Sequence, residues 1–313
     1  MKAPLFVSSG DLIADRRYKW ALDHAARGDL AAAADILGQT VELAPGFATA
    51  WFALGAIRDV QGERDGALAA FAAARDADPE DHHGARLHLA RLGGGNATPA
   101  MTETYVRRLF DQHAPDFDRA LRERLEYRAP EMLREAMQSV CAMLGRPLAF
   151  SNTLDLGCGT GLAGEAFRPM SNHLVGVDIS PGMIEQARGK NFYDRLEAAE
   201  LVRFLQAERP DNYDLVLAAD VFVYMAELAP AIRGISRVLM RAGVLAFTVE
   251  THDGDGVRLA PTLRYAHAES YVRTMLADAG LKPLRMARTS VRTEKGVPVP
   301  SLLVAAMREP ERV

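Results

Sequence analysis

The sequence Thr153-Leu-Asp-Leu-Gly-Cys-Gly-Thr-Gly-Leu162 indicates how the larger part of the chain folds. Residues 153–156 are predicted to form a short buried strand, and a helix is predicted to begin near Leu162. Glycines at 157, 159 and 161 lie between these two elements. Because glycine has no Cβ, such a turn can adopt positive φ and let its backbone lie against a ligand. The stretch therefore predicts a site for a nucleotide-type cofactor.

Acidic residues near this turn indicate the chemistry of the ligand. A dinucleotide fingerprint needs a third small residue and seats a pyrophosphate on the helix N-terminus, but Leu162 occupies that position here. Asp155 would repel a pyrophosphate, and it could bind an ammonium group directly or through water. Asp178 ends a second predicted strand, where an acid can bind both hydroxyls of a ribose. The predicted ligand, with a ribose and a cationic tail but no phosphate, is S-adenosylmethionine.

A lone Gly-x-Gly-x-Gly is equally typical of an ordinary loop, and the two acids argue against that alternative. Asp155-Leu-Gly-Cys-Gly-Thr-Gly161, followed by Val177-Asp178, resembles the class I S-adenosylmethionine-dependent methyltransferase family. The resemblance implies an α/β fold with a seven-stranded, doubly wound, Rossmann-like sheet, and S-adenosylhomocysteine as the product. Ligands then lie at the carboxyl ends of the strands, near the reversal of strand order.

The resemblance also implies roles for residues outside the loop. Ile179 and Met183 are expected to cover the adenine, and Glu200-Leu201 stands where relatives usually have Asp-Leu. The predicted cofactor site comprises Asp155, Gly157, Cys158, Gly159, Thr160, Gly161, Leu162, Asp178, Ile179, Met183, Glu200, Leu201, Asp220 and Val221, with Tyr127 and Arg128 from a covering segment.

Length and composition suit a protein of two domains. The chain has 313 residues, of which 49% are hydrophobic and 25% charged, as in ordinary globular proteins. A net charge of −4 gives no reason to expect nucleic acid as a partner. Two cysteines in unlike contexts, Cys141 and Cys158, indicate neither a disulfide framework nor a metal site. No signal peptide or membrane span is predicted, and a reducing cytoplasm is expected.

The N-terminal segment contains a repeat. Trp51, Leu54 and Gly55 begin a pattern that closes at Pro79, and Pro45 precedes Pro79 by the ~34 residues of a tetratricopeptide repeat. Residues 1–92 are therefore predicted to form a helical repeat domain. Its role is open between a peptide-binding groove and a packing or self-association module. Bacterial proteins that join such repeats to a methyltransferase core resemble this arrangement.

Three further segments complete the predicted organisation. Residues 93–101, with three consecutive glycines, are predicted to be a linker. Residues 102–147 are predicted to form a helical lid, in which Tyr127 and Arg128 are the candidates for contact with the cofactor. Residues 148–313 are predicted to form the methyltransferase core, with strands at 213–219 and 244–250, a last helix at 268–279, and a closing hairpin whose final strand is antiparallel.

The methyl acceptor is expected beside the ends of the fourth and fifth strands. Tyr224 and Tyr265 are predicted to be walls of its pocket. His267 is the candidate general base, and the alternative is that it only caps the last helix.

The leading functional prediction is a methyltransferase acting on oxygen, nitrogen or carbon of a small molecule. A protein methyltransferase that recruits its substrate through the repeats, and a cofactor-binding scaffold without turnover, are the alternatives.

Overall fold

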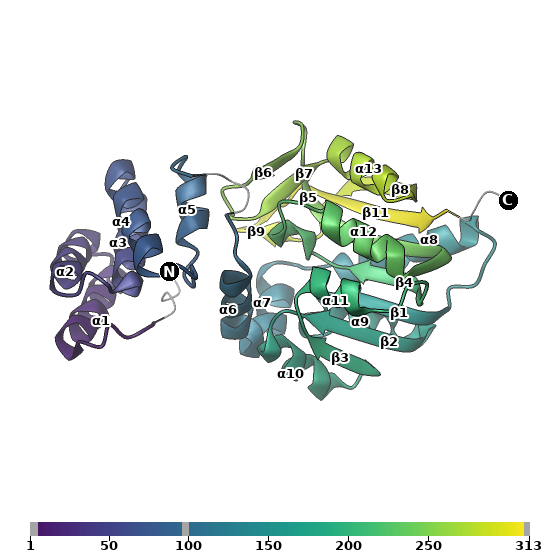
Figure 1. The fold of residues 1–313 in the computed structure, drawn as a ribbon, viewed down its shortest axis with the longest axis horizontal. Coiled ribbons are helices and arrows are strands. Elements are labelled where there is room, and N and C mark those ends of the chain that lie inside the picture. The colour runs from purple at the N-terminus through teal and green to yellow at the C-terminus, as the bar shows by residue number, and fades with distance from the viewer. Residues whose placement is uncertain (1–5, 96–99, 310–313) are drawn as a thin grey trace. The chain divides into compact units, whose positions relative to one another are not determined.

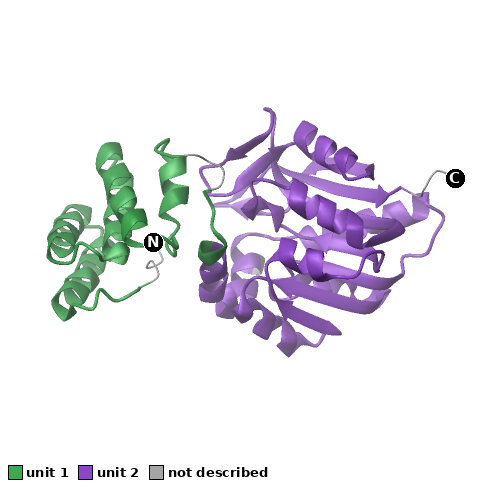
Figure 2. Cartoon of the chain, viewed as in Figure 1, with its two compact units in different colours: residues 1–105 green, residues 106–313 purple. Residues whose placement is uncertain are grey.

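The computed structural model describes residues 6–95 and 100–309, and the chain divides into two compact units, residues 1–105 and 106–313 (Figure 2). Part of the predicted linker at 93–101 lies outside the described residues. The division falls inside a helix, Glu103–His113, so it lies a few residues after the predicted end of the linker. Within the described ranges, no helix is long and apolar enough to cross a membrane.

The first unit is built from helices joined by short turns (Figure 1). Helices α1 and α2 pack together, as do α3 and α4. Gly28 and Gly62 adopt φ values of +85° and +79° in the equivalent turns, a conformation that costs glycine little. The helices are α1 (Leu12–Ala26), α2 (Leu30–Leu43), α3 (Ala48–Val60), α4 (Arg64–Ala77) and α5 (Ala85–Arg91).

Close packing of α3 on α4 depends on one glycine. A Cβ at Gly55 would lie 2.8 Å from the ring of Phe71, which is fully buried. The ring of Phe71 thus occupies the space that a larger residue at Gly55 would need. Trp51 is only half-buried, and its indole N–H donates to the carbonyl oxygen of Pro45 at 2.8 Å.

The second unit contains a mostly parallel sheet with the strand order β3-β2-β1-β4-β5-β11-β8 (Figure 1). Strand β11 is antiparallel to both of its neighbours, while the contacts from β3 to β5 are parallel. The order reverses at β1, which lies between β2 and β4. These strands are β1 (Phe150–Leu156), β2 (Ser171–Asp178), β3 (Arg195–Ala198), β4 (Tyr213–Ala218), β5 (Leu239–His252), β8 (Leu281–Thr289) and β11 (Ser301–Arg308).

Four short strands were not predicted. Strand β7 (Tyr265–Ala268) pairs with the end of β5, and β6 (Val257–Leu259) pairs with β7. The connection between β8 and β11 folds into a small hairpin of β9 (Thr293–Glu294) and β10 (Val297–Pro298). Both additions lie beyond strand ends, where local apolar patterning is weak.

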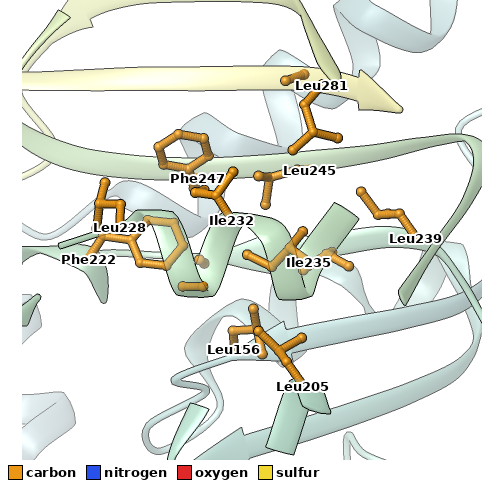
Figure 3. Close-up of a cluster of buried hydrophobic side chains, with 14 of the residues drawn as sticks. Leu156, Leu205, Phe222, Leu228, Ile232, Ile235, Leu239, Leu245, Phe247 and Leu281 are labelled. Carbon is orange, nitrogen blue, oxygen red and sulfur yellow. The ribbon is translucent and has the colours of Figure 1, made fainter. Parts of the chain in front are cut away.

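Helices cover both faces of the sheet because residues alternate between the faces along each strand. Leu245 and Phe247 of β5 join the cluster under α11, α12 and α13 (Figure 3), and Val244 and Ala246 join the cluster under α8 and α9. The helices and 3-10 turns of this unit are α6 (Glu103–His113), η1 (Ala114–Asp116), α7 (Phe117–Arg124), α8 (Ala129–Met143), α9 (Leu162–Phe167), η2 (Arg168–Met170), α10 (Pro181–Lys190), α11 (Leu201–Ala207), η3 (Phe222–Tyr224), α12 (Ala229–Val238) and α13 (Glu269–Asp278).

Candidate cofactor and acceptor site

The glycine-rich turn connects β1 to α9 at the carboxyl edge of the sheet. Gly157, Gly159 and Gly161 have φ values of +62°, +53° and +91°. A Cβ at Gly157 would collide with the side chain of Val221, which follows β4. The turn therefore needs glycine both for its backbone conformation and for its contact with the neighbouring strand end.

Asp155 lies inside the sheet edge, directly before the turn. Its Oδ2 accepts a hydrogen bond from the hydroxyl of Tyr193 at 2.6 Å, and its buried Oδ1 has no hydrogen-bond partner among the described residues. Burial raises the pKa of Asp155 to about 7, the Tyr193 hydrogen bond lowers it, and the charge of Asp178 raises it further. One buried oxygen is thus left for a donor, such as the ammonium group predicted from the sequence.

Sequence reasoning missed Tyr193, which follows α10. Its ring fills a slot walled by three glycines, and a Cβ at Gly161, Gly164 or Gly176 would meet it within about 3 Å. Its hydroxyl also accepts a hydrogen bond from the backbone N–H of Gly164 at 3.1 Å. The available signal was a pair of glycines in α9 and β2 that no turn requires.

Asp178 ends β2 beside the same turn. Its two carboxylate oxygens each accept a backbone hydrogen bond at 2.9 Å, from Gly159 and from Ser180. Burial raises the pKa of Asp178 to about 6, and the two backbone hydrogen bonds lower it. Ser180 caps α10 through Met183, as its sequence position predicts. Asp178 therefore holds the turn in place, and each of its oxygens keeps capacity for a further donor.

Asp111 and Asp118, in the helical segment that precedes β1, accept hydrogen bonds from residues of the glycine turn and of the start of α10. Asp111 of α6 accepts hydrogen bonds from the Ser180 hydroxyl at 2.6 Å and from the Gly182 N–H at 3.0 Å. Asp118 of α7 accepts a hydrogen bond from the hydroxyl of Thr160 in the glycine turn and forms an ion pair with Lys190. The sequence predicted a lid here but not these two residues.

The end of β4 contributes a third acid. Asp220 adopts a left-handed φ of +60°, and its N–H donates to Thr248 at 2.9 Å. Its Oδ2 pairs with Arg292, whose guanidinium is almost completely buried and also pairs with Glu250. Arg292 belongs to the connection between β8 and β9, and sequence reasoning missed it.

Comparison with known proteins agrees with this geometry. Residues 154–245 match the family model described as a methyltransferase domain. The unit of residues 106–313 contains a class I methyltransferase domain. Malonyl-[acyl-carrier protein] O-methyltransferase of Acetivibrio thermocellus is 35% identical over 101 residues, which are 32% of this chain and 35% of that protein. The chain spans 35% to 58% of the length of the first curated relatives that it matches.

Solved structures share the fold of the methyltransferase domain. Magnesium protoporphyrin IX methyltransferase (ChlM) from Synechocystis PCC 6803, with bound SAH, has a TM-score of 0.50 and 22% identity over 66% of this chain and 99% of that chain. The [4+2]-cyclase SpnF has a TM-score of 0.53 and 17% identity over 67% of this chain and 97% of that chain. A protein named for a different reaction thus shares this fold, so the fold alone does not determine the reaction and the residues of the site must.

Tyr127, Arg128 and Glu200, which are also predicted for the cofactor site, each form a hydrogen bond within the protein. The hydroxyl of Tyr127 donates to the Ala219 carbonyl at 3.4 Å, and burial raises its pKa well above the usual value. Arg128 is exposed, and its backbone N–H donates to Val291. Glu200 caps α11, because its carboxylate accepts hydrogen bonds from the N–H groups of Val202 and Arg203.

The remaining predicted cofactor residues lie in the glycine turn and in or beside the helices α9, α10 and α11. Cys158 is buried, and burial raises the pKa of its thiol. Leu162 and Leu201 are the first residues of α9 and α11, Met183 is buried in α10, and Ile179 is half-buried. No group of metal-binding side chains was found among the described residues.

The three predicted acceptor residues lie in η3, which follows β4, and in β7, which pairs with the end of β5. Tyr224 is half-buried in η3, where its ring packs edge-on against Phe110 of α6 at 5.1 Å. Tyr265 is fully buried in β7. His267, also fully buried in β7, contacts the Met225 carbonyl through Nε2 at 2.9 Å. Burial lowers the pKa of His267 to about 4, which favours a packing role over a base.

Proposed function

We propose that the protein is an S-adenosylmethionine-dependent methyltransferase whose acceptor is a small molecule. The observation that carries this proposal is the pair of buried acids on either side of the glycine turn, of which Asp155 has an unpaired oxygen. Asp155 would hold the ammonium end of the cofactor and Asp178 the ribose hydroxyls. When bound, the cofactor supplies a methyl group on a good leaving group, so the protein contributes mainly positioning.

The name of a curated relative and the placement of the site support a small-molecule acceptor. The curated relatives include an O-methyltransferase whose name gives malonyl-[acyl-carrier protein] as its substrate. Against the protein-substrate alternative, all of the described site residues lie within residues 106–313, so none of them needs the first unit. A scaffold without turnover is the third possibility, and measurement of methyl transfer separates it from the first two.

We further propose the domain limits 1–92, 93–101, 102–147 and 148–313, with the first as tetratricopeptide repeats. The turn glycines at equivalent places and the fit of Phe71 against Gly55 support the repeats. Their role as a packing or self-association module is favoured because fewer than three full repeats rarely bury their own faces.

Calorimetric titration tests the cofactor assignment. The protein should bind S-adenosylmethionine and S-adenosylhomocysteine but not NAD. Asp178→Ala should weaken binding by about 1–3 kcal/mol, because charge-assisted hydrogen bonds are left unmade. Asp178→Asn, which keeps a side-chain oxygen for the Gly159 N–H, should weaken binding less. Asp253→Ala, which removes a highly exposed carboxylate, is the control. Unchanged affinity in both Asp178 variants would contradict the assignment.

A further inference from the structure

Asp220 is held in a backbone conformation that is uncommon for residues other than glycine. Its φ of +60° lies in the left-handed region, two residues after the end of β4. Such strain persists where the surrounding structure enforces it, and it is common at functional sites. Here the hydrogen bond from its N–H to Thr248 and the ion pair with Arg292 hold both the backbone and the carboxylate.

One oxygen of this carboxylate is buried and unsatisfied. Oδ2 faces Arg292, while Oδ1 has no hydrogen-bond partner among the described residues. An unpaired buried carboxylate oxygen costs free energy, so a partner is expected when the site is filled. Arg292 is itself 1% exposed and is balanced by Glu250, so the charge of Asp220 is compensated in place.

The position of Asp220 joins this oxygen to the predicted transfer site. The next residue, Val221, packs against Gly157 of the glycine turn, and the preceding carbonyl, that of Ala219, accepts the Tyr127 hydroxyl. Asp220 interacts electrostatically with the ionisable side chains of Arg292, Glu250, Arg264 and Tyr127. Asp220 therefore lies between two residues that contact the cofactor loop and Tyr127, and we expect the acceptor beside it.

We propose that Asp220 receives the proton of a methyl acceptor that carries an O–H or N–H group, and that Arg292 positions its carboxylate. This rests on the proposed function. In the reaction, the bond from the acceptor oxygen or nitrogen to the methyl carbon forms while the carbon–sulfur bond breaks. The electron pair of that bond stays on sulfur, and the acceptor proton passes to Oδ1 of Asp220.

This proposal defines the class of acceptor. Hydroxyl compounds and neutral primary or secondary amines can donate to Oδ1 and lose a proton. Thioethers and tertiary amines cannot. It also assigns proton acceptance to Asp220 instead of His267, whose ring is enclosed and whose Nε2 faces the Met225 carbonyl.

The test uses full-length protein and S-adenosylmethionine with a tritiated methyl group, incubated with an extract of the source cells. The labelled product is isolated, and its methylated atom is identified. Asp220→Asn should lower the transfer rate at pH 7 by ~10²-fold or more, the scale for losing a general base. Affinity for S-adenosylhomocysteine, measured by calorimetry, should stay within about threefold, because this proposal places the carboxylate of Asp220 against the acceptor, and not against the cofactor as the sequence predicted. His267→Ala should stay within about threefold of the parent rate.

A second variant tests the positioning role. Arg292→Gln should move the acidic limb of the pH–rate profile to higher pH, because the compensating charge is gone. A merely structural role for Arg292 would leave that limb in place. Asp253→Asn breaks an exposed carboxylate–arginine pair with Arg288 and should change neither rate nor profile. Melting temperatures of all variants identify any that fail to fold. If Asp220→Asn fails to fold, the pH–rate profile of Arg292→Gln tests the proposal in its place.

Three results would overturn the inference. They are an Asp220→Asn rate within about threefold of the parent, an unmoved limb in Arg292→Gln, and a methylated thioether or tertiary amine. The proposed function fails separately, through absence of S-adenosylmethionine binding in the calorimeter or absence of any labelled product.

Discussion

At the scale of single residues, the pKa of Asp155 makes cofactor affinity sensitive to pH. Burial raises this pKa to about 7, and a bound ammonium group favours the ionised carboxylate. Affinity for S-adenosylmethionine should therefore rise roughly tenfold or more from pH 5.5 to 7.5. Calorimetry across this range checks the prediction. Tyr193→Phe should move the midpoint of this pH dependence upward. The hydrogen bond from Tyr193 lowers the pKa of Asp155 in the parent, so its removal raises that pKa. The same profile in Asp155→Asn would contradict the assignment.

The same shift affects the stability of the free protein. A carboxyl group whose pKa is higher in the folded than in the unfolded state contributes stability at low pH, and this contribution is lost as pH rises through the folded value. For Asp155 the loss spans the range from its ordinary value of 3.8 to about 7. The free energy of unfolding of Asp155→Asn should lack this component.

At the scale of elements, the segment of α6, η1 and α7 is tied to the glycine turn by few contacts. Asp118 bonds to Thr160 and Lys190, and the side chains of Asp118 and Lys190 are both partly exposed. Asp118→Asn should speed dissociation of S-adenosylhomocysteine about three- to tenfold, the scale of ~1 kcal/mol for such a pair. A chase of tritiated ligand with unlabelled ligand measures this rate. Asp116→Asn, whose pair with Arg119 lies within the segment, is the control. Equal dissociation rates in the two variants would show that the contacts of Asp118 do not retain the ligand.

At the scale of the whole molecule, the two units should be separable in function. Removal of residues 1–92 should leave the affinity for S-adenosylmethionine within about threefold, because the described site residues lie in residues 106–313. Solubility of the truncated chain should fall if the repeats are a packing module. Such a short array buries its apolar face on another part of the protein, and that part would become exposed. Calorimetry and sedimentation of the truncated and full chains measure both effects. Loss of transfer to protein acceptors alone would favour recruitment by the repeats.

Sequence alone predicted the features that depend on nearby residues. The glycine turn, Asp155 before it and Asp178 at the next strand end are set by backbone conformation and by strand and helix periods, which are local properties. The mostly parallel sheet with one antiparallel strand followed from the alternation of elements and from the family resemblance. The bounds of the last helix were also close, since the prediction at 268–279 compares with Glu269–Asp278 in α13.

Only the tertiary structure showed which distant side chains meet. Tyr193 reaches Asp155 across 38 residues, and Arg292 reaches Asp220 across 72. Neither pair belongs to a periodic pattern, because the order of strands in the sheet, rather than the order of residues in the chain, brings their ends together. The burial of His267 likewise depends on the unpredicted pairing of β7 with β5. Local sequence thus determined the cofactor turn, and long-range packing decided which charges surround it.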